Sequence, residues 1–118
     1  MNLSDLIRIM LKEEASDLHL KVNSPPFLRV HGGLVPVEGT SPLNEEEVRS
    51  LAFEMMEELA QKKFKRKKEA DFAFDHPDGS RFRVNVYMER GSPCVSMRHI
   101  PTEIPNFSDL SLPEVMEK

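Results

Sequence analysis

The chain has 118 residues, which fits one domain able to bury roughly two thirds of the surface of its unfolded form. Hydrophobic residues make up 39% and charged residues 31%, which excludes a disordered chain, and no apolar run approaches the ~20 residues needed to span a bilayer. The net charge of −4 argues against a general nucleic-acid binder, and the lone cysteine, Cys94, excludes an internal disulfide. We therefore expect a cytoplasmic protein.

A helix and then a strand are predicted at the start of the chain. Apolar residues recur at helical spacing at Leu3, Leu6, Ile7 and Met10. We expect Ser4 to cap this helix and either Ser16 or Asp17 to end it. From Asp17 to Val22 polar and apolar residues alternate, which predicts a strand with Asp17, His19 and Lys21 facing away from the core.

Two short strands and a pair of helices are expected next. The strands are Phe27–Val30 and Leu34–Val37, joined by a tight turn in which His31-Gly32-Gly33 supplies positive φ angles. Asn44 is the predicted cap of a second helix, whose buried stripe is Val48, Leu51, Ala52 and Met55. A break near residues 56–58 separates this helix from a third one, which runs through the basic stretch Lys62–Lys68.

Strand patterns dominate the remainder. Alternation at Phe72 and Phe74 is followed by a Pro77-Asp78-Gly79 turn, the longest alternating segment is 82–88, and a last strand is expected at Cys94–Ile100. After it we expect an extended tail over 101–105 and a short helix over Pro113–Lys118. The order of elements predicts the α+β class, with helices packed on a mostly antiparallel sheet of about six strands.

Arg81, Arg83 and Asn85 carry the most specific chemistry in the sequence. Alternation places them on the face opposite Phe82 and Val84, and Arg98 joins them if its strand is the neighbour. Guanidinium groups held by stiff strands suit the capture of phosphate or carboxylate. The alternative is an ordinary solvent-facing strand whose arginines form ion pairs with nearby acids.

Catalysis and metal binding are both unfavourable interpretations of the remaining polar residues. Ser16, Asp17 and His19 cannot converge as a nucleophile, base and orienting group from one extended strand, so a structural or interface role is expected. His31, His76 and His99 have no partner at metal-ligand spacing, and no metal site is expected. The Lys62–Lys68 run is predicted to be a solvated helix face, with attraction to an anionic membrane surface as the alternative.

Several of these segments together resemble the N-terminal domain of PilT-type ATPases, the retraction motors of type IV pili within the type II/IV secretion ATPase superfamily. The resemblance runs along essentially the whole chain, in order. It rests on residues 15–20 (Ala-Ser-Asp-Leu-His-Leu), Pro25-Pro26, residues 29–32, Asp71-Phe72, residues 81–85 (Arg-Phe-Arg-Val-Asn) and residues 98–101 (Arg-His-Ile-Pro).

The resemblance implies a PAS-like domain over residues 1–100, with residues 101–118 beginning a linker to a RecA-like ATPase domain. It implies a homo-hexamer in the full-length protein, which would use ATP and Mg and meet a platform protein at the inner membrane. Arg83 and Arg98, and next Arg81, are expected to face the nucleotide phosphates between domains. Asp17, His19 and Asn85 are expected at the subunit interface.

No Gly-Lys-Ser or Gly-Lys-Thr phosphate loop occurs in these 118 residues, so we expect the chain to have no ATPase turnover of its own. Without a neighbouring ATPase domain it is also expected to be monomeric or weakly associated. A stand-alone PAS-like ligand sensor or adaptor is the main alternative, which an apolar pocket inside the fold would favour. A nucleic-acid-binding domain that uses the lysine-rich helix is a weaker one.

Overall fold

The computed structural model describes residues 2–101 and contains helices and strands in the predicted order. The predicted helix over Pro113–Lys118 and the tail beyond Pro101 lie outside the described residues. The elements are α1 (Leu3–Lys12), β1 (Asp17–Lys21), β2 (Phe27–Val30), β3 (Gly33–Pro36), α2 (Glu45–Met55), α3 (Glu58–Lys67), β4 (Glu69–Asp75), β5 (Arg81–Glu89) and β6 (Ser92–Ile100).

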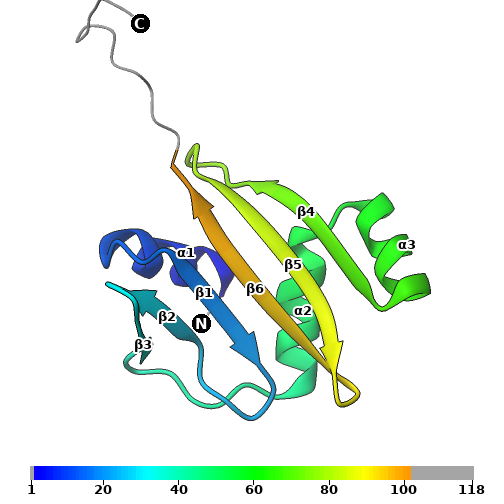
Figure 1. Ribbon diagram of the computed structural model, residues 1–118, viewed down its shortest axis with the longest axis horizontal. Helices are drawn as coiled ribbons and strands as arrows, with labels where there is room; N and C mark the ends of the chain where they lie inside the picture. Colours follow the sequence, from blue (N-terminus) through cyan, green and yellow to red (C-terminus); the bar gives the residue numbers. More distant parts are fainter. Residues whose placement is uncertain (1, 102–118) are drawn as a thin grey trace, which may run out of the picture.

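All six strands form one sheet in the order β3-β2-β1-β6-β5-β4, and every pair of neighbours is antiparallel (Figure 1). Strand β6 lies between β1 and β5, and so it joins the β1–β2–β3 half of the sheet to the β4–β5 half. The predicted α+β class and the six-stranded antiparallel sheet are therefore confirmed. This order brings the two halves of the chain together at the β1–β6 pair.

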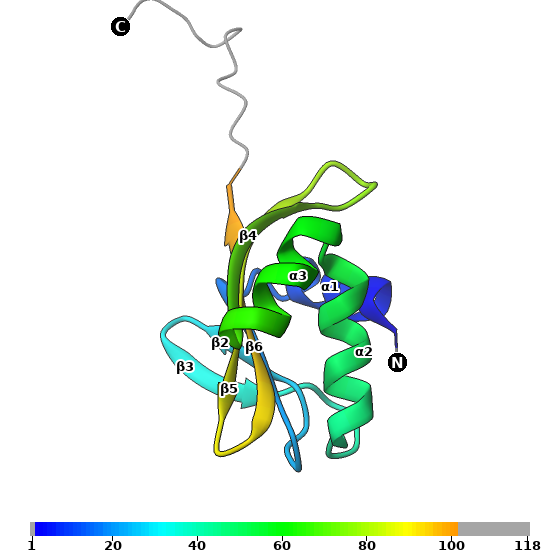
Figure 2. The ribbon, with the colours of Figure 1, turned by 90° about the vertical axis from the view of Figure 1, so that its right-hand side faces the viewer.

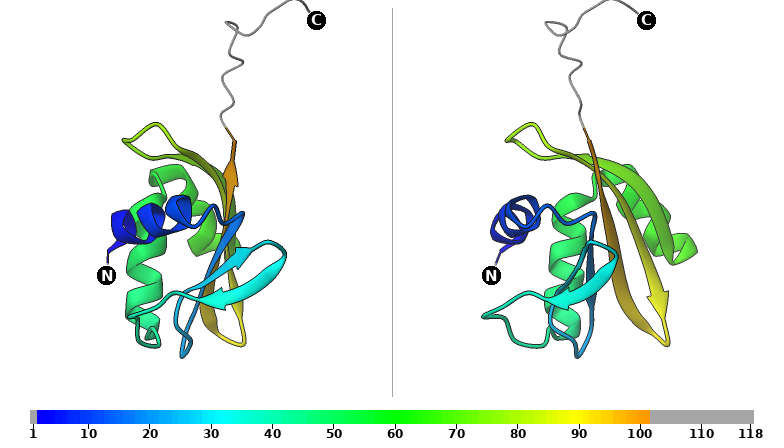
Figure 3. Two further views of the ribbon diagram at one scale, coloured as in Figure 1. Left: turned by 90° about the vertical axis from the view of Figure 1, so that its left-hand side faces the viewer. Right: turned by 60° about the vertical axis from the view of Figure 1, so that its left-hand side comes forward.

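The three helices lie on one side of the sheet, as Figures 2 and 3 show. One face of the sheet is thus buried by helices and the other remains open, an arrangement that antiparallel sheets permit. We call the uncovered side the open face.

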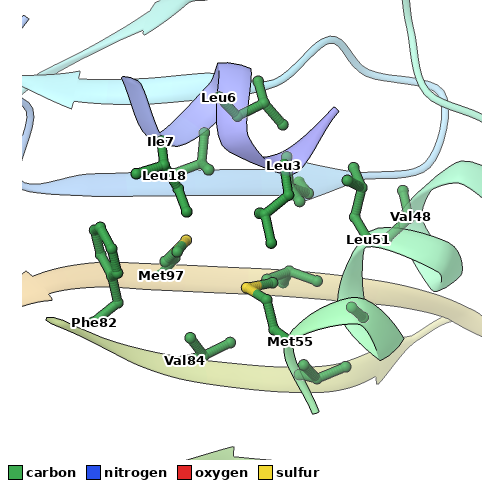
Figure 4. Close-up of a cluster of buried hydrophobic side chains, with 14 of the residues drawn as sticks. Leu3, Leu6, Ile7, Leu18, Val48, Leu51, Met55, Phe82, Val84 and Met97 are labelled. Carbon is green, nitrogen blue, oxygen red and sulfur yellow. The ribbon is translucent and has the colours of Figure 1, made fainter. Parts of the chain in front are cut away.

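The core fills the space between the helices and the sheet (Figure 4). Phe82, Met97 and Leu18 are completely buried, and the apolar stripes predicted for α1 and α2 point into the same cluster. Phe82 stacks against Phe74, with ring centroids 6.4 Å apart. Both halves of the chain therefore contribute to a single core.

The predicted cap of α2 is confirmed, whereas that of α1 is wrong. Asn44 accepts a hydrogen bond from the Glu47 N–H at 2.7 Å, and the Glu47 carboxylate accepts one from the Asn44 N–H. At α1 the cap is Asn2, because Asp5 at the third helical position completes the same reciprocal pair. Ser4 lies inside the helix instead.

The expected end of α1 is also wrong. The helix stops at Lys12 because Glu14 adopts a left-handed φ of 56°, and the chain then turns into the sheet. The Ser16 N–H donates to the Arg29 carbonyl at 3.0 Å, and the Ser16 carbonyl accepts from His99. These bonds make Ser16 part of the entry into β1.

Two-residue turns close both tight hairpins. In the β2–β3 turn the positive φ angles belong to His31 (51°) and Gly32 (82°), and β3 begins at Gly33. Arg90 (54°) and Gly91 (81°) form the matching turn between β5 and β6, so β6 begins at Ser92 rather than at Cys94. Two successive residues with positive φ give the twist that such hairpins require.

Candidate functional site

Arg29, Asp17, Arg98 and Arg83 lie side by side across the open face, one on each of four neighbouring strands. The register pairs Arg29 with Asp17, Asp17 with Arg98, and Arg98 with Arg83, from β2 through β1 and β6 to β5. We call these four residues the arginine row. The predicted neighbourhood of Arg83 and Arg98 is therefore present, since they face each other directly across the β5–β6 pair.

Asp17 is the buried member of the arginine row. Its side chain is only 7% exposed, although the alternation predicted that it faces outward. It does lie on the open face, but the Arg98 Nε donates to its Oδ2 at 3.2 Å and the Ser16 hydroxyl donates to its Oδ1 at 2.6 Å. Neighbouring side chains rather than helices therefore cover this carboxylate, which stays paired as a buried charge must.

Arg83 and Arg81 form ion pairs with carboxylates of β4 but remain largely in solvent. The Arg83 Nη2 donates to the Asp71 Oδ2 at 3.3 Å, and the Arg83 side chain is 70% exposed. The Arg81 Nε lies 3.6 Å from the Asp75 Oδ1. The ion-pair alternative is thus observed, and each contact engages one nitrogen of a guanidinium group that has several donors.

His19 lies beside the arginine row, two residues after Asp17 on β1. It pairs with Phe27 of β2 on one side and with Ser96 of β6 on the other. Within the described residues its Nε2 is buried and has no hydrogen-bond partner. Desolvation lowers the pKa of His19, and the nearby Asp17 carboxylate opposes this shift. The cations Arg29, Lys21 and Arg98 lower the pKa further, so the neutral imidazole is favoured.

Asn85 of β5 lies in the same cross-strand row as His19. It pairs with Ser96, so that one strand separates it from His19. Its amide nitrogen contacts the Glu69 carboxylate at 3.3 Å and the Ala70 carbonyl at 3.4 Å. The structure thus places Asp17, His19 and Asn85 together on the open face of the sheet.

A shallow hollow of about 390 Å³ opens beside His19. It is lined by His19, Lys21, Ser24, Phe27, Arg29, Leu34 and Tyr87. Arg29 and Tyr87 were not among the predicted site residues. Tyr87 continues the alternation of Arg81, Arg83 and Asn85 along β5, which is a signal the sequence contains. Arg29 becomes a neighbour of Asp17 only through the pairing of β1 with β2.

The chemistry that this face offers is the binding of anions and of a partner surface. Guanidinium groups on stiff, paired strands keep their spacing, which favours bidentate contacts with phosphate or carboxylate. Nowhere in residues 2–101 do three His, Cys, Asp or Glu side chains gather closely enough to hold a metal ion. None of the described helices is long and apolar enough to cross a membrane.

Comparisons with known proteins identify relatives of this chain. No protein-family model matches it. It is 33% identical to the type IV pilus ATPase PilU of Pseudomonas aeruginosa and 31% identical to the type IV pilus retraction ATPase PilT of the same bacterium. Each match covers all of this chain but only 31% and 34% of the relative, respectively.

A solved structure agrees with these matches. The pilus retraction motor PilT with bound ADP superposes with a TM-score of 0.84 at 31% identity, over 97% of this chain and 33% of that one. The chain thus spans about a third of the length of these proteins. Over its whole length it is homologous to the N-terminal third of the PilT and PilU twitching-motility ATPases, and it has the fold of the PilT N-terminal domain.

Proposed function

We propose that this chain is the N-terminal domain of a hexameric motor ATPase of type IV pili, where it packs subunits together and couples nucleotide state to domain movement. In this proposal residues 1–100 form the domain and residues 101–118 begin the linker to a RecA-like ATPase domain. ATP and Mg are used by the full-length protein. The ring acts in the cytoplasm, at the inner membrane, against a platform protein of the pilus machinery.

The arginine row is the observation that carries this proposal. It lies on the open face of a domain whose relative PilT has been solved with ADP bound. Arg83 and Arg98 face each other there, and their side chains are 70% and 71% exposed. The row holds three guanidinium groups and only one carboxylate, Asp17, so an incoming anion would stabilise its excess positive charge.

In the proposed mechanism the arginines act between domains. Arg83, Arg98 and Arg81 donate hydrogen bonds to the phosphates of a nucleotide held by the RecA-like domain of the same or a neighbouring subunit. A guanidinium group there neutralises charge that develops on the transferred phosphoryl group. Loss of that phosphate after hydrolysis weakens the contact and lets the domain move, which links turnover to deformation of the ring.

Asp17, His19 and Asn85 have the other proposed role, contact with an adjacent subunit. The half-covered His19 ring and the hollow beside it supply apolar surface at the centre of the open face. A subunit that covers this hollow could also give the buried His19 Nε2 a hydrogen-bond partner. The open face would then serve as one continuous interface that includes the arginine row.

A stand-alone ligand sensor would need space for its ligand inside the fold. The volume between the helices and the sheet is instead filled by fully buried side chains such as Phe82, Met97 and Ile7 (Figure 4). Domains that enclose small molecules usually do so in preformed pockets. The packed interior supports the motor domain over the sensor.

The sharpest test of the proposal compares Arg83→Ala with Asp71→Ala in the full-length protein. If Arg83 contacts phosphate, its removal should lower the ATPase rate by roughly a hundredfold, as removal of one transition-state contact does. Asp71→Ala breaks the same ion pair from the other side and should leave the rate within about threefold of wild type. Equal losses in the two variants would assign Arg83 to the ion pair alone.

Arg98 needs a paired variant because its removal leaves the buried Asp17 carboxylate without its partner. The Arg98→Ala, Asp17→Asn double variant removes both charges and keeps the fold, while the ATPase rate should still fall. Phe82→Ala is the contrasting control, since it empties a fully buried site and should cost about 3–5 kcal/mol of stability. Thermal melts of each variant separate loss of fold from loss of activity.

A further inference from the structure

A groove separates α3 from the edge strand β4, and its lining includes Asp71, the ion-pair partner of Arg83. It has a volume of about 660 Å³ and lies where α3 packs beside β4 (Figure 2). One wall is a stripe of α3 at helical spacing, formed by Leu59, Lys62, Lys63 and Arg66. The other wall is formed by residues 71–73 of β4, with Met55 of α2 also in the lining. We call this feature the α3–β4 groove.

The stripe of α3 that faces the groove is not used by the fold. Phe64 anchors the helix in the core with only 4% of its surface exposed, whereas Leu59 is 81% exposed. Lys62 contacts only Glu58 of its own helix, at 3.5 Å, and that pair is almost fully solvated. The exposed Leu59 and the partly buried Phe72 therefore supply apolar surface to the groove, and three cations of α3 form a basic rim.

The charge of the rim indicates the chemistry of an occupant. Residues 62–68 read Lys-Lys-Phe-Lys-Arg-Lys-Lys, and only Phe64 interrupts the cations. A chain segment rich in Asp and Glu complements this rim, and one apolar side chain of that segment fits beside Leu59 and Phe72. Helices and extended peptides are commonly bound in this way, with apolar anchors in a groove and charges around it.

The concave shape of the α3–β4 groove favours a protein segment over a lipid surface as its occupant. Phe72 is partly buried in the lining of the groove, where a protruding apolar side chain of a protein segment can contact it. The acidic residues of an occupant therefore lie against Lys62, Lys63 and Arg66, because Glu57 and Asp71 elsewhere in the lining repel carboxylates. We propose that the α3–β4 groove docks an acidic segment of a partner protein that carries an apolar anchor residue.

Binding of a defined probe to the complete 118-residue chain tests this proposal. The probe is a fluorescein-labelled peptide, Glu-Asp-Glu-Leu-Phe-Glu-Asp-Glu, and its control has serine in place of leucine and phenylalanine. Fluorescence anisotropy should show binding of the first peptide, with a Kd at least about tenfold lower than that of the control. Leu59→Ser should remove that preference, whereas Val35→Ser, at another exposed apolar residue, should keep it.

Charge variants locate the binding to the groove. Lys63→Glu and Arg66→Glu should each weaken binding about tenfold, whereas Lys67→Glu, on the same helix but outside the lining, should weaken it by less than about threefold. Equal losses in all three variants would reduce the effect to general charge attraction and overturn the proposal. Tight binding to phosphatidylglycerol vesicles without a preference for the apolar peptide would assign α3 to a membrane surface instead.

Discussion

Asp17 shows how far the alternation of polar and apolar residues can be used at the scale of one residue. The pattern correctly places Asp17 on the side of the sheet away from the helices, yet the side chain is 7% exposed. Its cover comes from Arg98, which is distant in the sequence and adjacent only because β6 pairs with β1. The face to which a strand side chain points is thus encoded locally. Its degree of burial depends on neighbouring strands, which the sheet topology determines.

His19 gives a pH prediction at the same scale. Burial lowers its pKa in the folded chain, while the unfolded chain titrates near ~6.5. Above ~6.5 both states are neutral and the full stability is present. As the pH falls below that value the unfolded state takes up a proton that the folded state does not, so stability should decrease.

Urea unfolding at pH 7.5 and pH 5.5 measures this effect. Carboxylates also begin to titrate over this range, so the informative quantity is the difference between wild type and His19→Gln, which lacks the imidazole. Wild type should lose more of its free energy of unfolding between the two pH values than the variant does. Identical losses would show that the folded structure does not disfavour the imidazolium ion.

At the scale of elements, the start of α1 shows that the sequence contained the signal for the correct capping residue. Ser4 and Asn2 are both good capping residues, and the choice depends on the residue three positions later. Asn2 has Asp5 there and forms the reciprocal pair, whereas the chain around Ser4 is already helical. Periodicity therefore locates a helix well, but its first residue depends on specific hydrogen bonds.

Cap variants test this corrected boundary. Asn2→Ala should lower the free energy of unfolding by about 1 kcal/mol, because the Asp5 N–H loses the Asn2 side-chain oxygen that accepts its hydrogen bond at 2.8 Å. Ser4→Ala should change it by less than about 0.5 kcal/mol, as substitutions at exposed sites usually do. Chemical denaturation of both variants gives the comparison, and a larger loss for Ser4→Ala would restore Ser4 as the cap.

The arrangement of elements was predictable in part. The alternating segments correctly indicated six strands, and the two Gly-containing turns indicated which neighbours form hairpins. The insertion of β6 between β1 and β5 is a long-range pairing that local patterns do not determine. Arg83 and Arg98 lie on consecutive strands, so the sequence could suggest that they are neighbours. Arg29 joins them only because β1 pairs with both β2 and β6, and it was therefore not predicted.

At the scale of the whole molecule, the homology and the geometry support the same account. The chain matches the N-terminal third of pilus ATPases, and its helix-free sheet face carries the arginine row. An antiparallel sheet can leave one face in contact with water, which keeps this face available to a partner. The central claim is that this face contacts a nucleotide-bearing domain in the ring.

An electron cryo-microscopy structure of the full-length protein with Mg and a non-hydrolysable ATP analogue tests that claim most directly. The account predicts a hexamer in which the open face is covered by a RecA-like domain. In it, a guanidinium nitrogen of Arg83 or Arg98 lies about 2.7–3.2 Å from a phosphate oxygen. A ring in which the open face points to solvent, and in which no residue of this domain touches the nucleotide, would contradict it.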